Sequence, residues 1–160
     1  KMGEERMTIS QEEYLKTIYF LLKENKKARV TDIATTLGYS KASVNKAIKL
    51  LKEMNMINYE SYGDIQLTKE GEKQAKNIVN KHNILKAFLI EVLNVNQETA
   101  EEEAKSMKHA ISEDTAEKFA NYIKSIIPVQ ELECNYDLES EKCKTCIRLK
   151  TKKRFDQNNK

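Results

Sequence analysis

The segment from Arg29 to Leu51, RVTDIATTLGYSKASVNKAIKLL, constrains the fold of this 160-residue chain more than any other part. Gly38 divides it into two short stretches, each with apolar residues at helical spacing. Glycine is common just beyond the end of a helix, and Thr31 and Ser40 are suitable N-caps for the two stretches. The segment therefore predicts two short helices joined by a tight turn, which is a helix-turn-helix.

The second helix of this motif has one apolar face and one polar face. Val44, Ile48 and Leu51 form the face that we expect to be buried. Asparagine and lysine on the other face can hydrogen-bond base edges in a DNA major groove, and serine and lysine can bind phosphates. For any single residue, a solvated helix face is the plain alternative. The predicted DNA-binding residues of this helix are Lys41, Ala42, Ser43, Asn45 and Lys46.

Two segments with alternating apolar and polar residues follow this helix. Residues 57–60 and 65–68 flank Gly63 and Asp64, a pattern that indicates a β-hairpin with a longer turn. A hairpin directly after a recognition helix makes a winged helix. We expect Tyr62, near the tip of the wing, to contact the DNA backbone.

Helical patterns dominate the rest of the chain. Ser10 and Glu13 have the spacing of a capping box, which predicts a first helix that starts after Ser10. A broad apolar stripe over residues 69–93 predicts a long helix that leads to a second domain and forms part of a dimer interface. Two further helices are predicted, over residues 98–111 and from the N-cap Ser112 to about residue 126.

The fold class that these patterns predict is mainly α. It combines a winged helix-turn-helix domain, with a two-strand wing, and a helical dimerisation domain. One proline, four glycines and a hydrophobic fraction of 39% suit a helix-rich protein with a limited core, for which dimerisation buries more surface. The expected parts are a DNA-binding domain (residues 1–75), a dimerisation and effector domain (residues 76–127) and a basic, cysteine-containing segment (residues 128–160).

Hydropathy and charge limit the class of function. No apolar run approaches the roughly 20 residues of a membrane span, and the N-terminal stretch KMGEERMTIS has no apolar signal region. We therefore expect a cytoplasmic protein with no membrane partner. The net charge is only +3, but residues 142–160 hold eight Lys or Arg residues against one Asp. This concentration suggests a polyanion partner, and a solvated basic tail is the alternative.

The three cysteines, Cys134, Cys143 and Cys146, have the spacing C-x8-C-x2-C. An odd number in a chain that looks cytosolic does not suggest a disulfide framework. Three thiolates suit zinc or an iron–sulfur cluster, each of which needs four ligands. The fourth ligand could be His82, His109, an acidic residue or a residue of the other subunit. Free redox-sensing thiols and cysteines without a special role are the alternatives.

Five separated stretches carry a resemblance to a known family. They are EEYLKTIY (12–19), the helix-turn-helix (29–51), LTKEGEKQA (67–75), KHNILKAFLIEVL (81–93) and KHAISED (108–114). In this order, across residues 10–126, they resemble the diphtheria-toxin-repressor and manganese-transport-regulator (DtxR/MntR) family of metal-dependent transcriptional repressors. The resemblance implies a winged-helix domain, a helical dimerisation domain, homodimers bound to palindromic operator DNA, and control by Fe(II) or Mn(II).

The resemblance also implies a metal site, and this chain departs from it. Carried over by position, the suitable ligands are Glu13, His82, Glu101 and His109, of which Glu101 is a secondary ligand. Other positions of the same site hold residues that cannot bind a metal, because an ammonium group has no lone pair to offer. These residues are Lys16, Lys86, Lys105 and Lys108.

Several lysines near one site would repel a divalent cation. We hypothesise that lysine ammoniums pair with Glu13 or Glu101 and mimic the charge of the bound metal, so that the ordinary metal switch is lost or much weakened. The cysteines could then replace that function. For His82 and His109, the alternative is that they are ordinary helix residues.

Three classes of function compete. The leading hypothesis is a sequence-specific DNA-binding transcriptional repressor controlled by a cysteine-bound metal or iron–sulfur cluster; a redox-sensing or metal-independent regulator is the alternative. An enzyme that uses the CxxC pair is disfavoured, because the sequence has no Ser/His/Asp set and no Gly-rich phosphate loop. A winged helix that binds a protein partner instead of DNA does not account for the lysines on the recognition helix.

Overall fold

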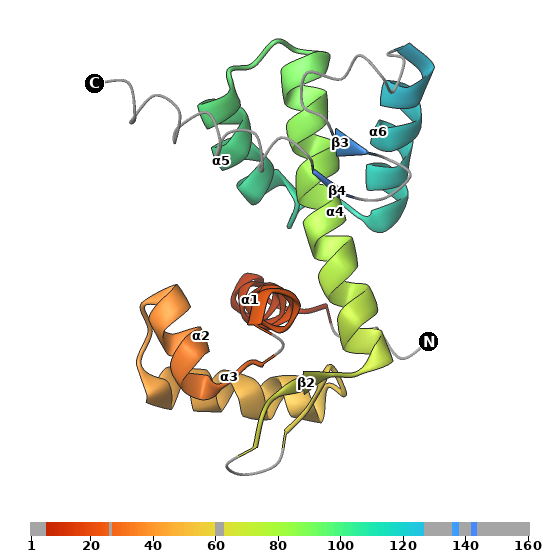
Figure 1. Ribbon diagram of the computed structural model, residues 1–160. Coiled ribbons are helices and arrows are strands. Elements are labelled where there is room, and N and C mark those ends of the chain that lie inside the picture. Colours follow the sequence, from red (N-terminus) through yellow and green to blue (C-terminus); the bar gives the residue numbers. More distant parts are fainter. Residues whose placement is uncertain (1–5, 26, 60–62, 127–135, 138–141, 144–160) are drawn as a thin grey trace, which may run out of the picture. The chain divides into compact units, whose positions relative to one another are not determined.

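The fold is mainly helical, as the sequence predicts (Figure 1). The computed structural model describes residues 6–25, 27–59, 63–126, 136–137 and 142–143. The chain divides into two compact units, Lys1–Val79 and Asn80–Lys160, and α4 begins in the first and ends in the second. No helix in the described ranges is long and apolar enough to cross a membrane. The helices are α1 (Ile9–Asn25), α2 (Val30–Leu37), α3 (Lys41–Glu53), α4 (Lys69–Glu91), α5 (Gln97–Met107) and α6 (Glu113–Ile126), and the strands are β1 (Ile57–Asn58), β2 (Gln66–Leu67), β3 (Tyr136–Asp137) and β4 (Lys142–Cys143).

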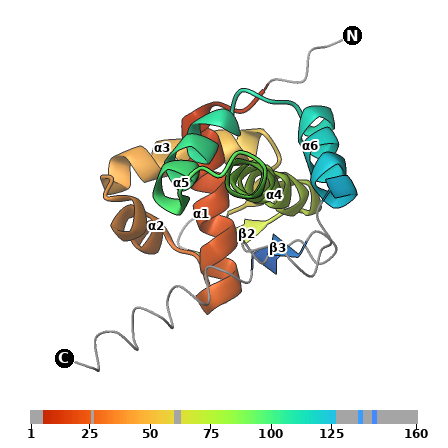
Figure 2. The same ribbon diagram turned by 90° about the horizontal axis from the view of Figure 1, so that it is seen from above.

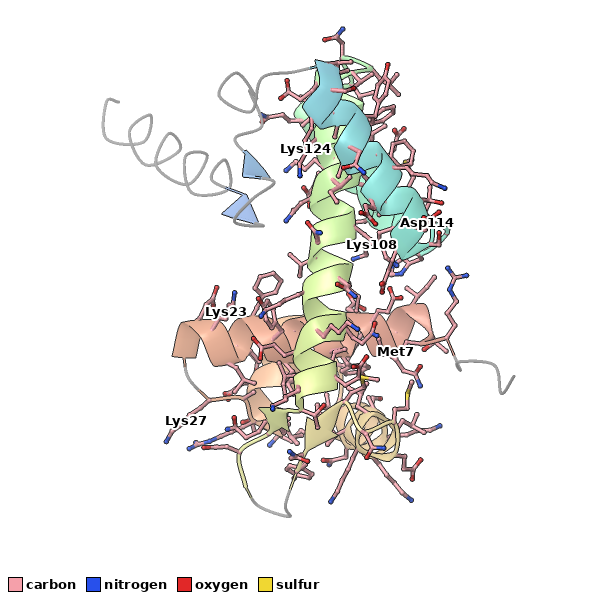
Figure 3. The ribbon with its side chains drawn as sticks, turned by 90° about the vertical axis from the view of Figure 1, so that its right-hand side faces the viewer. Met7, Lys23, Lys27, Lys108, Asp114 and Lys124 are labelled. Carbon is pink, nitrogen blue, oxygen red and sulfur yellow. The ribbon has the colours of Figure 1, made fainter. Side chains whose placement is uncertain are left out.

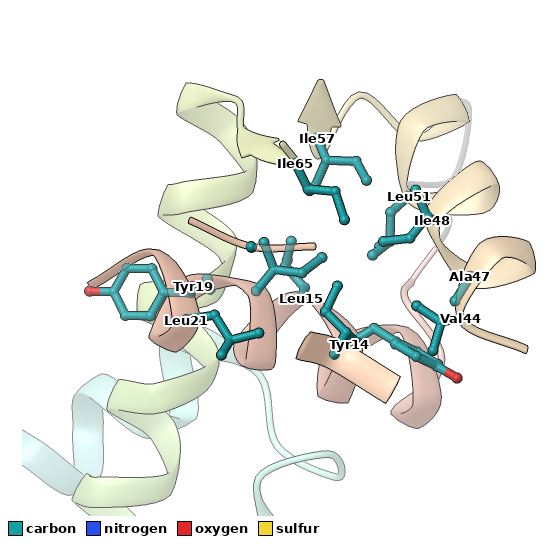
Figure 4. Close-up of a cluster of buried hydrophobic side chains, with 14 of the residues drawn as sticks. Tyr14, Leu15, Tyr19, Leu21, Val44, Ala47, Ile48, Leu51, Ile57 and Ile65 are labelled. Atoms are coloured by element: carbon teal, nitrogen blue, oxygen red, sulfur yellow. The ribbon is translucent and has the colours of Figure 1, made fainter. Parts of the chain in front are cut away.

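The core of the first unit forms where the apolar stripes of α1 and α3 meet the hairpin (Figure 4). Leu15 of α1 and Leu51 of α3 are fully buried, and Ile57 and Ile65 cover them from the wing side. The predicted buried face of α3 is confirmed, because Val44, Ile48 and Leu51 are each at most 1% exposed. This packing fixes the rotation of α3 about its axis and so determines which side chains it presents to solvent.

Helix termini agree only in part with the predicted caps. The first helix begins before Ser10, because Thr8 and Gln11 form the reciprocal pair: the Gln11 N–H donates to Thr8 Oγ1 at 3.2 Å and the Thr8 N–H donates to Gln11 Oε1 at 2.8 Å. The N-cap of α2 is Arg29 and not Thr31, since the Arg29 N–H donates to the Asp32 carboxylate at 3.2 Å. Gly38 ends α2 as predicted, in the left-handed conformation with φ of 70°.

The predicted wing is present as a short antiparallel hairpin. Ile57 pairs with Leu67 and Asn58 with Gln66, so the strands are shorter than the alternating pattern suggests. The Ile65 N–H donates to Ala28 O at 2.9 Å, which ties the second arm of the hairpin to the segment before α2. The Lys52 ammonium donates to Tyr59 O at 2.8 Å and fastens the first arm to α3. The position of the wing is therefore set by α3 and by the loop between α1 and α2.

In the second unit, α4 lies between α5 and α6 (Figures 1 and 2). Leu85 and Leu89 of α4 pack against Ala100 and Ala104 of α5, whose small side chains let the two helices approach closely. On the other side, Ile84 and Ala87 pack against Ile123 of α6.

The helix ends of the second unit differ slightly from the prediction. The helix predicted over 98–111 ends at Met107, and Lys108, His109 and Ala110 form a turn. Ser112 caps α6 as predicted, because its Oγ accepts from the Thr115 N–H at 3.2 Å. Asp114 in the first turn of α6 and Lys124 in its last turn suit the helix dipole (Figure 3). The β3–β4 pairing, Tyr136 with Cys143 and Asp137 with Lys142, was not predicted.

Candidate DNA interface and effector site

The structure places the predicted DNA-binding residues of α3 on one exposed surface. Lys41, Ala42, Ser43, Asn45 and Lys46 are all exposed, as is Lys49 one turn further along the helix. Val44, Ala47 and Ile48 between them are buried. A helix held by its apolar face, with Lys and Asn pointing outward, has the geometry needed to enter a major groove.

Ser43 also has a structural role in α3. The Ser43 N–H donates to Ser40 Oγ at 3.2 Å, and the two hydroxyl oxygens lie 3.0 Å apart. Ser40 is thus the N-cap of α3, as predicted. Tyr62, the predicted wing contact, lies outside the described residues.

A second cluster of polar side chains surrounds Glu101, where α4 packs against α5. Its carboxylate accepts from the Lys86 ammonium at 2.8 Å through Oε2, and Oε1 lies 3.0 Å from Nε2 of His82. The Lys105 ammonium lies 3.8 Å from Oε1. The lysine–Glu101 pairing that the sequence suggested is therefore present, and Glu101 is the centre of the cluster although the family pattern gave it a secondary place.

Burial differs strongly across this cluster. The side chains of Lys86 and His82 are 7% and 15% exposed, whereas Glu101 is 35% and Lys105 is 57% exposed. Lys108, which follows α5 (Figure 3), is also buried. Burial alone would raise the pKa of the Glu101 carboxyl, but the hydrogen bond from Lys86 and the nearby His82 and Lys105 outweigh it and lower that pKa below 4.5. Glu101 is therefore an ionised acceptor near neutral pH.

The surroundings of His82 disfavour its protonated form. Burial lowers its pKa below 6.5; the Glu101 carboxylate opposes this shift, while Lys108 and Lys86 reinforce it. Because an ionised carboxylate can only accept, the hydrogen of the neutral ring lies on Nε2 and points to Glu101. Nδ1 is then an unprotonated acceptor, and it is buried without a hydrogen-bond partner among the described residues.

Two other predicted metal ligands, Glu13 and His109, come from segments outside α4 and α5. Glu13 lies on α1 in the first unit, where its Oε2 accepts from the Tyr39 hydroxyl at 3.4 Å. His109 lies in the turn after α5, because the helix predicted over residues 98–111 ends at Met107. Of the cysteines, only the backbone of Cys143 is described, in β4; Cys134 and Cys146 lie outside the described residues. Within the described ranges, no group of three or more His, Cys, Asp and Glu side chains could hold a metal ion.

Comparisons with known proteins agree with this architecture. Residues 6–65 match the family "Iron dependent repressor, N-terminal DNA binding domain" and residues 68–126 match "Iron dependent repressor, metal binding and dimerisation domain". An uncharacterised helix-turn-helix transcriptional regulator of Methanocaldococcus jannaschii is 38% identical over 113 residues, which are 70% of this chain and 90% of that protein. The transcriptional regulator MntR of Bacillus subtilis (strain 168) is 31% identical over 116 residues, 72% of this chain and 81% of its own length.

Solved structures show the same fold. The manganese regulator SloR matches with a TM-score of 0.63 and 28% identity, over 74% of this chain and 55% of SloR. ScaR with bound Zn²⁺ matches with a TM-score of 0.64 and 25% identity, over 71% of this chain and 53% of ScaR. This chain thus spans about half the length of these two structures.

These observations define a winged-helix DNA-binding protein with an attached helical domain. The chain belongs to the DtxR/MntR family of DNA-binding, metal-dependent transcriptional repressors. Members of this family regulate transcription and are not enzymes.

Proposed function

We propose that this protein is a transcriptional repressor that binds a double-stranded operator as a homodimer in the cytoplasm, with α3 of each copy in the major groove. The observation that carries the proposal is the exposed surface of α3, which includes Asn45 and Lys46, while Val44 and Ala47 on either side of them in the sequence are buried. Lys41 and Ser43, at the first turn, suit phosphates beside the groove. Two recognition helices related by a dimer axis would read half-sites about one helical turn of DNA apart.

Binding to the promoter next to its own gene, compared with a scrambled duplex of equal length, tests this function. We expect tighter binding to the promoter, and an affinity that falls steeply as salt is raised, because phosphate contacts release counterions. Fluorescence anisotropy at several salt concentrations measures both quantities. Equal affinity for both duplexes would reject sequence-specific binding, and no binding to either would favour a protein partner.

The proposed dimer uses an apolar groove between the end of α4 and α6. Phe88, Val92 and Phe119 line it, and the rings of Phe88 and Phe119 meet edge to face with centroids 4.7 Å apart. Leu93 and Tyr122 at its rim are 55% and 50% exposed, which is unusual for large apolar side chains. A second copy of this chain is the occupant we propose, because the family match named for dimerisation includes both helices.

Tyr122→Glu is expected to weaken this dimer by about 100-fold or more, because interface aromatics are frequent hot spots and each dimer contains two copies of the substitution. Sedimentation velocity over a range of concentrations measures the dissociation constant. Lys124→Glu, an exposed change on the same helix, is the matched control and should leave it nearly unchanged. A Tyr122→Glu dimer as tight as the wild type would place the interface elsewhere.

For the effector, we propose control through Cys134, Cys143 and Cys146, which would bind zinc or an iron–sulfur cluster or act as redox-sensing thiols. Support comes from the sequence alone, namely the CxxC pair with a third cysteine nearby. Elemental analysis of the anaerobically purified protein separates bound metal from free thiols. A visible absorbance band would indicate a cluster, and zinc without such a band would exclude one.

A further inference from the structure

Lys86 is an unusual residue for the interior of the second unit. It is only 6% exposed, and it follows Leu85, which is fully buried against Ala100 and Ala104. A charged ammonium is costly to bury unless a partner compensates it. Glu101 is that partner, and its carboxylate is held 2.8 Å from the Lys86 nitrogen on the neighbouring helix.

The donor set around Glu101 does not fit a divalent metal ion. A metal would need lone pairs from His82 and Glu101, but Nε2 of His82 lies within hydrogen-bond distance of Oε1, at 3.0 Å, and the Lys86 ammonium lies 2.8 Å from Oε2. The Lys105 ammonium lies 3.8 Å from Oε1 of the same carboxylate. Nδ1 of His82 is a further buried acceptor without a partner among the described residues, but it offers a single lone pair, whereas Mn(II), Fe(II) and Zn(II) need at least four ligands.

The electrostatic surroundings oppose a metal as well. The Lys86 ammonium is buried 2.8 Å from the Glu101 carboxylate, and Lys108 in the same domain is buried as well. A divalent ion placed beside Glu101 would be repelled by the Lys86 ammonium that already occupies this position. Chemistry and charge thus agree that this part of the chain is built around an internal cation.

We propose that the Lys86 ammonium takes the place of the metal ion in the dimerisation and effector domain, tying α4 to α5 through Glu101 without any divalent cation. The inference rests on the proposed repressor function and names the regulation of its effector site. A metal ion can dissociate and so act as a signal, whereas an ammonium on α4 is always present. The domain would therefore keep one arrangement of α4 and α5 at all metal concentrations, and Mn(II) or Fe(II) would not switch operator binding at this site.

Metal uptake by the full chain tests the inference directly. All variants carry Cys134→Ser, Cys143→Ser and Cys146→Ser, so that thiols contribute no binding. Equilibrium dialysis against micromolar Mn(II), followed by elemental analysis, should find no stoichiometric uptake by the protein with Lys86 intact.

Lys86→Glu removes the ammonium and adds a carboxylate beside His82 and Glu101, and we expect it to bind Mn(II) stoichiometrically. Adding Mn(II) should then change its operator affinity by about 5- to 150-fold, the usual range of allosteric coupling, but leave the Lys86 protein unaffected.

Thermal unfolding gives a second readout that is independent of metal and DNA. Lys86→Met replaces the side chain with an uncharged one that is one atom shorter, and it should lower Tm by about 5 °C or more because it breaks a buried pair. Lys105→Met removes the exposed cation from the same carboxylate and should change Tm by no more than about 1 °C. Lys86→Arg retains the charge and should restore most of the loss.

Two results would overturn the inference. One is stoichiometric Mn(II) or Fe(II) uptake by the cysteine-free protein with Lys86 intact, with operator binding that follows it. The other is equal, small Tm changes for Lys86→Met and Lys105→Met. If Lys86→Glu does not fold, uptake by the Lys86 protein and the Tm series still decide the question. If no variant binds operator DNA, the proposed function fails, while uptake and Tm still judge the role of Lys86.

Discussion

Gly71→Ala is expected to lower the free energy of unfolding by about 3 kcal/mol or more. A Cβ built at this position would overlap the carbonyl oxygen of Met56 and lie 2.8 Å from its carbonyl carbon. Both groups belong to the backbone, so no side-chain rotation relieves the overlap. The same carbonyl oxygen accepts from the N–H of Thr68 at 3.0 Å, and the Gly71 N–H donates to Thr68 Oγ1 at 2.9 Å. Relief of the clash would therefore disturb the start of α4 and its contact with the wing.

Urea unfolding followed by circular dichroism measures this effect, and two controls identify its cause. Gly38→Ala meets no atom within 4 Å but must adopt a φ of +70°, so it should cost only about 1 kcal/mol from backbone strain. Lys73→Ala changes an exposed residue of α4 and should stay within about 0.5 kcal/mol of the wild type. A Gly71→Ala protein as stable as the Lys73→Ala protein would show that α4 and the segment before β1 are not in close contact.

Local signals in the sequence were enough for the elements that build the DNA-binding domain. Gly38 and Ser40 mark the turn of the helix-turn-helix, and the spacing of Val44, Ile48 and Leu51 determines which face of α3 is buried. Local signals did not fix a helix end where two N-cap candidates compete, or where the sequence contains no residue that marks the end. Thr8 and Ser10 both begin a capping-box pattern, and the sequence alone does not decide between them. Residues 97–113 contain no Gly or Pro, so the early end of α5 at Met107 could not be anticipated.

The effector cluster shows a different limit of sequence-based prediction. Comparison with the family's ligand positions showed that lysines replace metal ligands. It also showed that Glu101 or Glu13 could pair with these lysines. Which carboxylate Lys86 contacts depends on how closely α5 approaches α4, and that distance is set by Ala100 and Ala104. The family pattern gave Glu101 a secondary place because in that pattern a metal organises the ligands. Here an ammonium needs one strong acceptor, and Glu101 is the carboxylate placed to supply it.

On α3, Asn45→Ala is expected to reduce affinity for the specific operator by about 100-fold while changing non-specific binding little. An amide that contacts a base edge contributes about 1–3 kcal/mol of discrimination, and a dimer loses two such contacts.

Lys46→Ala tests the neighbouring position. If Lys46 contacts phosphate, its loss should weaken binding to specific and scrambled duplexes alike and reduce the salt slope by about two for the dimer, one for each copy. Anisotropy titrations with both duplexes at four salt concentrations distinguish these outcomes.

These two substitutions leave the fold of the domain intact, because Asn45 and Lys46 are exposed and the buried face of α3 is untouched. Lys73→Ala, a loss of charge from α4, is the matched control and should bind the operator as the wild type does. Unchanged affinity for both α3 variants would mean that this surface does not enter the groove. Loss of operator binding by Asn45→Ala alone would instead identify α3 as the reader of base sequence, and would separate that role from the Lys86–Glu101 pair in the other unit.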